Sequence, residues 1–246
     1  MKDKTLKIDI VSDVACPWCY VGKRQFEKAL ENMKDLDLEV NWKPFQLNPT
    51  IPEGGLDRDS YYRNKFGSQE KVDKMMTRLI EFGKKVDIDF KKRDRIPNTR
   101  RMHSLLHAAR EKGFSNELKE AFFEAYFEKN RNLADDEVVI DIAEQFGWSR
   151  EEILKIMEDE EIAYEINKEI RDVQNRGVSG VPFFIINNQY GVSGAQPPEV
   201  LERWIRETKK ELDISEDKEI HDNGNAANNS QDTDKAEACA IDDPNC

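Results

Sequence analysis

The hydrophobic pattern changes period twice along this chain, and this constrains the fold more than any other feature of the sequence. Two short apolar runs, Leu6–Val11 and Leu38–Phe45, predict strands. Between them, apolar residues from Cys16 to Met33 recur at helical spacing. Pro17 stands at the first helical position, where its missing N–H has no partner to lose. The chain is therefore predicted to open with strand, helix, strand.

The middle of the chain keeps to a helical period from Pro49 to Asn175. Residues suited to cap a helix precede its apolar stretches, at Ser68, Asn98, Ser115, Asp135 and Ser149. Ser149 and Glu152 also have the spacing of a capping box. The pattern predicts a bundle of about five helices, with a break near residues 158–161 in the last one.

The period changes again near the end of the chain. Val181–Ile186 is a continuous apolar run, Asn187-Asn188 is suited to a turn, and Tyr190–Ser193 predicts a second strand of a hairpin. Pro197-Pro198 then opens a last helix that the apolar pattern carries to Leu212. Residues 213–238 are acidic and offer almost nothing to bury, which predicts a disordered linker.

Composition excludes two large classes of partner. The chain has 36% charged residues and a mean hydropathy of −0.80. No stretch approaches the roughly 20 apolar residues of a membrane-spanning helix, so a membrane role is excluded. The formal net charge of −12 argues against binding to a phosphate backbone. The N-terminal residues lack the apolar run of a secretory signal, which predicts a cytoplasmic protein.

Cysteines carry the clearest chemical signal. The chain has four cysteines, too few for a disulfide framework, and in a reducing compartment such residues indicate redox or metal chemistry. Cys16-Pro17-Trp18-Cys19 spans the predicted junction of strand and helix, where helix N–H groups stabilise a thiolate at Cys16. Cys19, one turn later and less exposed, can attack a mixed disulfide formed there. Pro17 stiffens the turn, and Trp18 adds an apolar contact.

Metal binding is the weaker interpretation of these residues. Cys239 and Cys246 would have to supply the second half of a zinc site, but six residues separate them, too many for a usual knuckle. His103 and His107 have a spacing that can bind a metal, yet the accompanying glutamate of a His-Glu-x-x-His site is missing. We interpret both histidines as flanking a core stripe, and we predict no metal site.

Two other clusters have a structural and a functional interpretation. The basic residues Lys91–Arg95 and Arg100-Arg101 are interpreted as a solvated loop and helix start, the alternative being a site for an anion such as a glutathione carboxylate. The aromatic residues are interpreted mainly as core, the alternative being a peptide groove; they are Phe122, Phe123, Tyr126 and Phe127.

A proline late in the chain completes the pattern. Gly180-Val181-Pro182 leads into the apolar strand, where a proline cannot donate to the ladder, and a cis Val181-Pro182 bond fits this place. With the early Cys-x-x-Cys, the sequence resembles the thioredoxin-like superfamily and, in detail, the DsbA-like, FrnE-type cytoplasmic oxidoreductases. These are related to the 2-hydroxychromene-2-carboxylate isomerases. The segments that carry the resemblance are Ser12–Tyr20, Asn98–His103, Ala134–Val138 and Gly177–Pro197.

The resemblance implies an α/β, thioredoxin-like fold with a helical insertion domain and a disordered C-terminal tail. The expected domains are residues 1–48 with 176–212, the insertion 49–175, the acidic linker 213–238 and the tail 239–246. It implies that Cys16 and Cys19 are the redox pair and that Pro182, with Val181, faces them and contacts the substrate. The isomerase relatives use glutathione and typically have serine in place of the first cysteine. Because this chain has Cys16 at that position, it resembles the dithiol oxidoreductases more than the isomerases.

The predicted function is thiol–disulfide exchange with protein thiols or disulfides, without a metal or organic cofactor. One alternative is a glutathione-dependent isomerase or transferase acting on a small molecule, with glutathione as co-substrate. Another is a non-catalytic holdase that uses the helical insertion. Cys239 and Cys246 are either an auxiliary redox pair that reaches Cys16 through the linker or a spectator tail, and the sequence favours neither.

Overall fold

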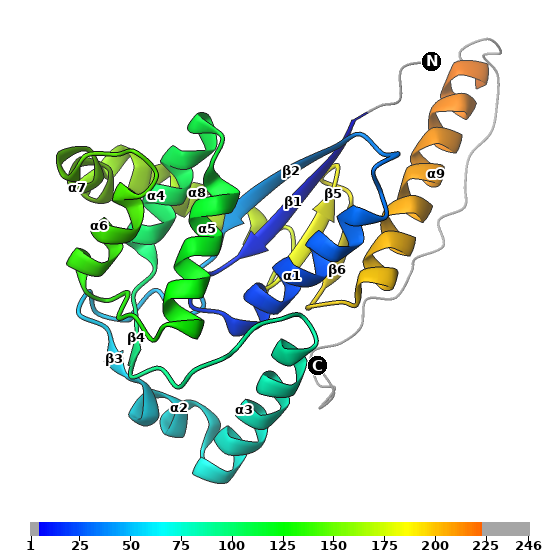
Figure 1. Cartoon of the computed structure of the whole chain (residues 1–246). Coiled ribbons are helices and arrows are strands. Elements are labelled where there is room, and N and C mark those ends of the chain that lie inside the picture. Colours follow the sequence, from blue (N-terminus) through cyan, green and yellow to red (C-terminus); the bar gives the residue numbers. More distant parts are fainter. Residues whose placement is uncertain (1–4, 223–246) are drawn as a thin grey trace.

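The computed structural model of the chain describes residues 5–222 and joins strands from residues 6–44 with strands from residues 183–193 in one sheet (Figure 1). Its strands are β1 (Leu6–Ser12), β2 (Leu38–Pro44), β5 (Phe183–Ile186) and β6 (Tyr190–Ser193). Their order in space is β2–β1–β5–β6. β1 runs parallel to β2 and antiparallel to β5, pairing Ile8 with Val40 on one side and with Ile186 on the other. The predicted strands and hairpin are confirmed.

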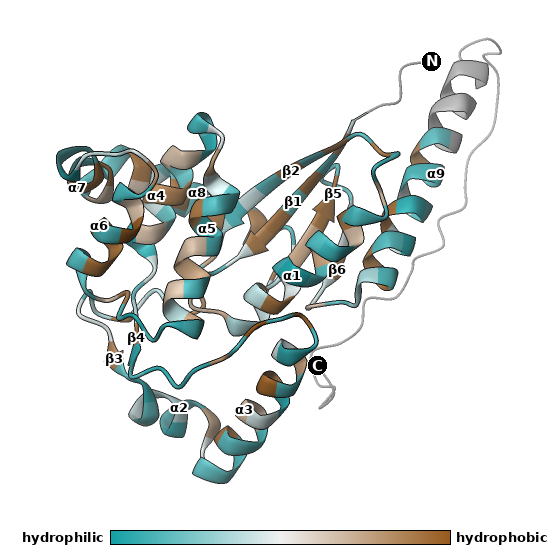
Figure 2. Ribbon diagram, in the orientation of Figure 1, coloured by the Kyte–Doolittle hydropathy of each residue, from teal (hydrophilic) through white to brown (hydrophobic). Residues whose placement is uncertain are grey.

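Helices cover both faces of this sheet. On one face, α1 (Pro17–Glu31) and α9 (Pro198–Asp222) pack Phe26 and Leu201 against Ile8 and Phe184. On the other face, Val173 of α8 (Glu160–Asn175) lies in a cluster with residues of β1 and β5. Figure 2 shows hydrophobic residues on the central strands β1 and β5 and hydrophilic residues on the outer helix faces, as expected for strands covered on both sides. The predicted α/β, thioredoxin-like class is confirmed.

The chain between β2 and α8 is mostly helical. Its α-helices are α2 (Arg58–Phe66), α3 (Gln69–Lys84), α4 (Arg100–Lys112), α5 (Ser115–Phe123), α6 (Asp136–Glu144) and α7 (Arg150–Glu158). The side chains of Ser68, Asp135 and Ser149 cap α3, α6 and α7, and the capping box with Glu152 is present. Asp159 caps α8 and separates it from α7. These predicted caps and the predicted break are confirmed.

Four local elements were not predicted. Helix α2 lacks a regular apolar stripe, because its large apolar side chains are Tyr61, Tyr62 and Phe66. Two short strands, β3 (Leu56–Asp57) and β4 (Arg95–Ile96), pair across a long sequence separation. After α5, a π-helical turn η1 (Glu124–Glu128) continues the chain. Each depends on contacts with distant residues rather than on local sequence period.

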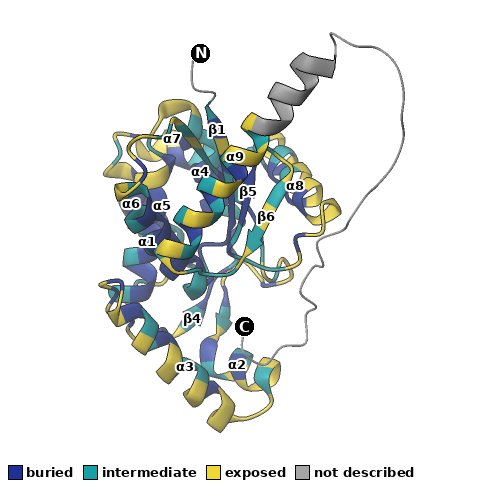
Figure 3. Ribbon diagram, turned by 90° about the vertical axis from the view of Figure 1, so that its right-hand side faces the viewer, coloured by how far each residue is buried: buried dark blue, intermediate teal, exposed yellow. Residues whose placement is uncertain are grey.

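The aromatic residues of α5 and η1 form the centre of a second core. Phe122, Phe123, Tyr126 and Phe127 are all at most 2% exposed. Tyr20 of α1 stacks on Phe123, with ring centroids 5.0 Å apart. The interpretation of these residues as core is confirmed, and the same contacts hold α1 against the helical segment. Figure 3 shows this buried interior and the exposed outer faces of α3 and α8.

Helix α9 extends further than its apolar pattern. It continues to Asp222, ten residues beyond Leu212, where the apolar pattern ends. Charged residues can extend an exposed helix without burying a face, and Lys209 pairs with Asp213 one turn later. The remainder of the predicted linker, with Cys239 and Cys246, lies outside the described residues. Across residues 5–222, none of the helices combines the length and apolar character of a membrane span.

Candidate functional site

Cys16 lies at the junction of β1 and α1, as the sequence predicted. It occupies the N-cap position with an extended backbone, and Pro17 is the first residue of the helix. The backbone N–H of Cys19 donates to the carbonyl oxygen of Cys16 at 3.1 Å. Both cysteines are free thiols, and Cys16 is 4% exposed while Cys19 is 1% exposed. The first thiol is therefore the more accessible of a buried pair.

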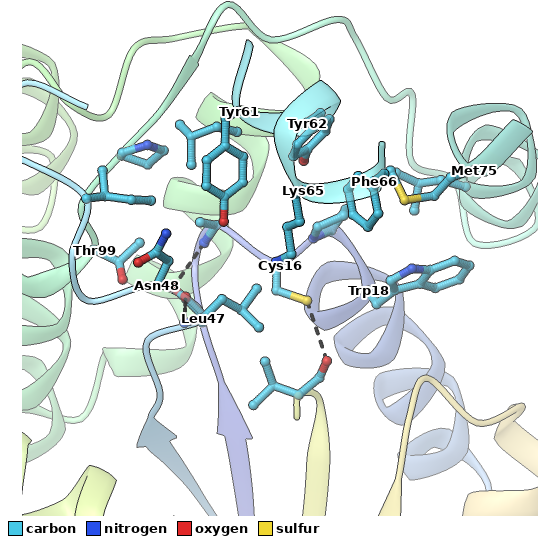
Figure 4. A pocket seen from close by; sticks show the side chains of 18 of the residues that line it. Cys16, Trp18, Leu47, Asn48, Tyr61, Tyr62, Lys65, Phe66, Met75 and Thr99 are labelled. Carbon is cyan, nitrogen blue, oxygen red and sulfur yellow. Dashed lines mark hydrogen bonds between the residues drawn. The ribbon is translucent and has the colours of Figure 1, made fainter. Parts of the chain in front are cut away.

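The loop before β5, much later in the sequence, faces this thiol. The Val181-Pro182 peptide bond is cis, as the sequence suggested. The Cys16 thiol donates to the carbonyl oxygen of Val181, with Sγ 3.5 Å from the oxygen (Figure 4). The carbonyl oxygen of Pro182 accepts from the N–H of Gly194 at 2.9 Å, which ties this loop to the end of β6. Residues 165 positions apart thus meet at the sulfur.

Gly22 of α1 keeps Pro182 in this place. A Cβ atom on Gly22 would lie 2.9 Å from Cγ of Pro182. We expect Gly22→Val to push Pro182 away from Cys16, to lower the free energy of unfolding by about 1–3 kcal/mol and to slow disulfide exchange. Urea unfolding and an exchange assay measure the two effects. Gly54→Val is the control, because a Cβ there has no atom within 4 Å. An unchanged stability and exchange rate would contradict this role.

A buried carboxylate lies beneath the Cys16 loop. Asp13 is 2% exposed and accepts from the N–H groups of Leu47 (2.8 Å) and Ala15 (3.2 Å). Nε2 of His103 lies 3.6 Å from Oδ1 of Asp13 and donates to the carbonyl oxygen of Phe45 at 2.9 Å. Burial works to raise the pKa of Asp13, but His103 and the two N–H groups outweigh it and hold that pKa below its usual value. Asp13 therefore stays a carboxylate.

The two histidines of α4 have separate partners. Burial lowers the pKa of His103, which favours its neutral form despite the nearby Asp13. Nδ1 of His107 instead lies 3.3 Å from Oε1 of Glu169. In the described part of the chain, no three His, Cys, Asp or Glu residues are grouped in a way that could hold a metal ion.

A buried cation faces the dithiol from the helical segment. Lys119 of α5 is 1% exposed, and its Nζ lies 4.8 Å from the ring centroid of Trp42 and 5.6 Å from that of Phe123. Burial lowers its pKa to about 8, although the negative charges of Cys19 and Asp13 work to raise it. Lys119 could not be predicted from the sequence, because nothing local distinguishes a lysine that tertiary contacts will bury.

The surroundings of Cys16 favour its protonated form. The hydrogen bond with Cys19 is the main cause that raises the pKa of the Cys16 thiol well above its usual value, and burial and the charge of a Cys19 thiolate add to it. The backbone N–H of Cys19 works in the opposite direction. Once one thiol has ionised, the other holds its proton more tightly. In the free protein Cys16 is therefore held as a thiol, whereas its place at a helix N-terminus predicts a thiolate.

A cavity of about 220 Å³ opens beside Cys16. Figure 4 shows Tyr61, Tyr62, Lys65 and Phe66 of α2 on its far side. Met75 of α3 closes one end, and the loops after β2 and β4 complete the wall. Sequence reasoning missed this lining because α2 was not predicted. Its clustered aromatic residues were the available signal.

One basic residue corrects the interpretation of the Lys91–Arg95 run as solvated. Arg93 is 1% exposed, and its guanidinium carbon lies 4.7 Å from the ring centroid of Phe127 and 5.4 Å from that of Tyr126. The π-helical turn presents these rings, so tertiary structure supplies its partners. Lys92 and Arg101 instead form ion pairs, with Asp59 and Asp136.

Comparisons with known proteins agree with this architecture. The family described as "DSBA-like thioredoxin domain" matches residues 7–206. A solved structure of a probable DsbA oxidoreductase from Streptomyces coelicolor has a TM-score of 0.78 and 32% identity, covering 96% of this chain and 97% of that one. The uncharacterized protein YwbO of Bacillus subtilis (strain 168) is 28% identical over 215 residues, which cover 84% of this chain and 98% of that protein.

A more distant structure shares the fold alone. It is a 2-hydroxychromene-2-carboxylate isomerase, with a TM-score of 0.64 and 16% identity over 85% of this chain and 98% of that one. The chain therefore resembles one structure described as an oxidoreductase along nearly its whole length, and an isomerase in backbone arrangement.

Proposed function

Because the chain belongs to the family of DSBA-like thioredoxin domains, we propose that it is a thiol–disulfide oxidoreductase that acts on protein disulfides through Cys16 and Cys19. The observation that carries this proposal is the position of the Cys16 thiol. It lies at the N-terminus of α1, 3.5 Å from the Val181 carbonyl oxygen, with Cys19 in the first turn of the helix behind it. A helix N-terminus lowers the energy of a thiolate placed there.

The exchange proceeds in two balanced steps. The Cys16 thiolate attacks one sulfur of a substrate disulfide, so that the substrate S–S bond breaks, a mixed disulfide forms and one substrate thiolate leaves. Cys19 then loses its proton and attacks the Cys16 sulfur, which releases the second substrate thiolate and forms the Cys16–Cys19 disulfide. Two electrons pass from the dithiol to the substrate. The reverse sequence oxidises a substrate dithiol.

Three groups prepare these steps. The carbonyl oxygen of Val181 accepts from the Cys16 thiol while it is protonated, and Val181 with Pro182 offers backbone to an extended substrate segment. The Lys119 ammonium stabilises negative charge on Cys19. Asp13 holds the loop before α1 through Leu47 and Ala15. We expect no resident metal or organic cofactor, because the dithiol and the substrate balance the reaction.

Location and direction form the second part of the proposal. We propose that the protein works in the cytoplasm, where the glutathione pool and protein thiols are its redox partners. The reduction potential of the Cys16–Cys19 pair then decides whether it reduces or oxidises them.

An equilibrium redox titration of the full-length protein tests the function. The protein is equilibrated in glutathione or dithiothreitol buffers and then alkylated. Mass spectrometry of the peptide with Cys16 and Cys19 then gives the fraction that is reduced. We expect a reversible two-electron transition. A midpoint near or below about −270 mV indicates a reductant, and one between about −120 and −200 mV an oxidant or isomerase. The lack of any reversible transition in this peptide would contradict the proposal.

A second function is favoured by the cavity beside Cys16. Its volume of about 220 Å³ suits a small molecule, which fits a glutathione-dependent isomerase or transferase. In that case Cys16→Ser retains activity, because the hydroxyl can replace the thiol in binding glutathione. Calorimetry with reduced glutathione and a Cys16→Ser assay separate the two functions.

A further inference from the structure

Disulfide exchange by itself does not require the cavity beside Cys16. The thiol forms one part of its wall, and Trp18 and Val181 continue that wall on the side of the sheet. Helices α2 and α3 form the opposite side, so the cavity lies where the first sulfur meets the helical segment (Figure 4). A substrate disulfide that reaches Cys16 must therefore place the neighbouring part of its chain at or in this cavity.

The lining residues of α2 and α3 rest on a core of their own. Tyr62 and Val72 are buried with Ile51 and Ile96, and Phe66 and Met75 pack on this cluster while remaining half-buried. Because the cluster supports them, the wall is formed before a substrate binds. Methionine side chains adapt to occupants of different shape, while the aromatic rings keep the walls in place.

The charged groups of the lining leave the interior apolar. Asp13 is occupied by the N–H groups of Leu47 and Ala15 and by His103. Lys65 is exposed, and its Nζ lies 5.7 Å from the ring centroid of Tyr61 and 5.9 Å from that of Phe66. The Lys65 ammonium therefore lies over the faces of these rings, and a ligand deep in the cavity would meet no unpaired charge. An apolar group is the best-matched occupant.

We propose that this cavity is a side-chain pocket that selects protein disulfides in which a large apolar residue flanks the attacked cysteine. The proposal rests on the proposed function and names its substrate class. A cavity of about 150 Å³ can hold benzene, so the 220 Å³ beside Cys16 can receive a phenylalanine side chain. Glutathione offers no such side chain next to its cysteine, and its charged ends find no counterpart in the apolar interior.

The test uses peptides that differ only beside their cysteine. Two series, acetyl-X-Cys-Gly-amide and acetyl-Gly-Cys-X-amide with X as Ala, Phe or Trp, are prepared as mixed disulfides with thionitrobenzoate. The Cys16 thiolate attacks the peptide sulfur, the mixed S–S bond breaks, and thionitrobenzoate leaves and is followed by absorbance. Reduced full-length protein is used, and the rate of Cys16→Ser is subtracted to remove reaction at other thiols.

We expect the Phe peptide to react about ten times faster than the Ala peptide in at least one series, as apolar pockets discriminate by such factors. Met75→Trp fills the pocket and should reduce this ratio to about two or less. Thr77→Trp is the matched control, because Thr77 is exposed on the same helix and is not part of the lining; it should keep the wild-type ratio. Met75→Ala enlarges the pocket and should make Trp the preferred residue.

Separate outcomes contradict the pocket and the function. Equal rates for Phe and Ala peptides in both series, with a normal redox transition of Cys16 and Cys19, would overturn the pocket and leave the function standing. A full Phe preference in folded Met75→Trp would also overturn it. If that variant does not fold, a Met75→Ala variant that reacts faster with the Phe peptide than with the Trp peptide also overturns the pocket. Wild-type rates no higher than those of Cys16→Ser, with no redox transition, would instead reject the function itself.

Discussion

Replacing Cys16 with serine is expected to lower disulfide exchange by about three orders of magnitude or more, to the rate of the uncatalysed reaction. The reason is chemical, because a hydroxyl at the N-terminus of α1 can accept hydrogen bonds but cannot form a disulfide. Reduction of a protein disulfide by the full-length protein, with dithiothreitol as the source of electrons, measures the effect.

Cys19→Ser is the matched variant in the same motif. It keeps the attacking thiol and removes the thiol that completes the reaction, so a mixed disulfide between Cys16 and the substrate should accumulate. Mass spectrometry under non-reducing conditions detects this adduct. Exchange activity that survives in Cys16→Ser would contradict the proposed function and favour the glutathione-dependent one.

Replacing Lys119 with methionine is expected to raise the free energy of unfolding at pH 7 by about 3 kcal/mol. Burial lowers the pKa of Lys119 from 10.5 to about 8, and a shift of this size corresponds to about 3 kcal/mol for keeping the charge buried. Methionine fills a similar volume between Trp42 and Phe123 without that charge. Urea unfolding at pH 7 provides the comparison with wild type.

The difference in free energy of unfolding between Lys119→Met and wild type should decrease as the pH rises. Below about pH 8, Lys119 is protonated in both the folded and the unfolded chain, and burying its charge destabilises the folded chain by the full amount. Between about pH 8 and 10.5 the unfolded chain binds more protons, so the stability of wild type rises relative to the variant. Unfolding measured at pH 7, 9 and 10.5 follows this change.

Lys23→Met is the matched control for a buried lysine. Lys23 is 2% exposed, like Lys119, but its Nζ pairs with Glu27 at 2.5 Å and with Glu120 at 2.7 Å. Its replacement removes one of the two cations that pair with these carboxylates, the other being Arg24, and should lower the free energy of unfolding by about 1–3 kcal/mol. If Lys119→Met were destabilising by as much as Lys23→Met, the view that Lys119 opposes folding would be wrong.

Lys119→Met should also separate stability from activity. Since the ammonium favours negative charge on Cys19, its loss should slow the resolution of the mixed disulfide while the protein becomes more stable. Lys119 lies in α5 and Asp13 in the loop before α1, far apart in the sequence. Their electrostatic effect on Cys16 and Cys19 therefore could not be predicted from the sequence around either residue.

Local patterns were enough to predict most elements of the fold. β1 and β2, α1 with Pro17 at its start, and the hairpin of β5 and β6 follow from hydrophobic period and turn residues. Caps such as Ser149 follow from hydrogen bonds to N–H groups within one turn. The extension of α9 and the helix α2 were missed, because neither has a regular apolar stripe that continues through its length.

The sequence by itself determined where Cys16 and Cys19 lie, since Cys16, Pro17 and Cys19 stand within one turn at the start of α1 and their positions depend on neighbours along the chain. Only the tertiary structure decided what surrounds them. It buried Lys119 and Asp13, brought Val181 to the Cys16 sulfur and placed α2 and α3 around the cavity. Burial and electrostatic interaction depend on distance in space, and residues far apart in the sequence reach those distances only when the whole core packs.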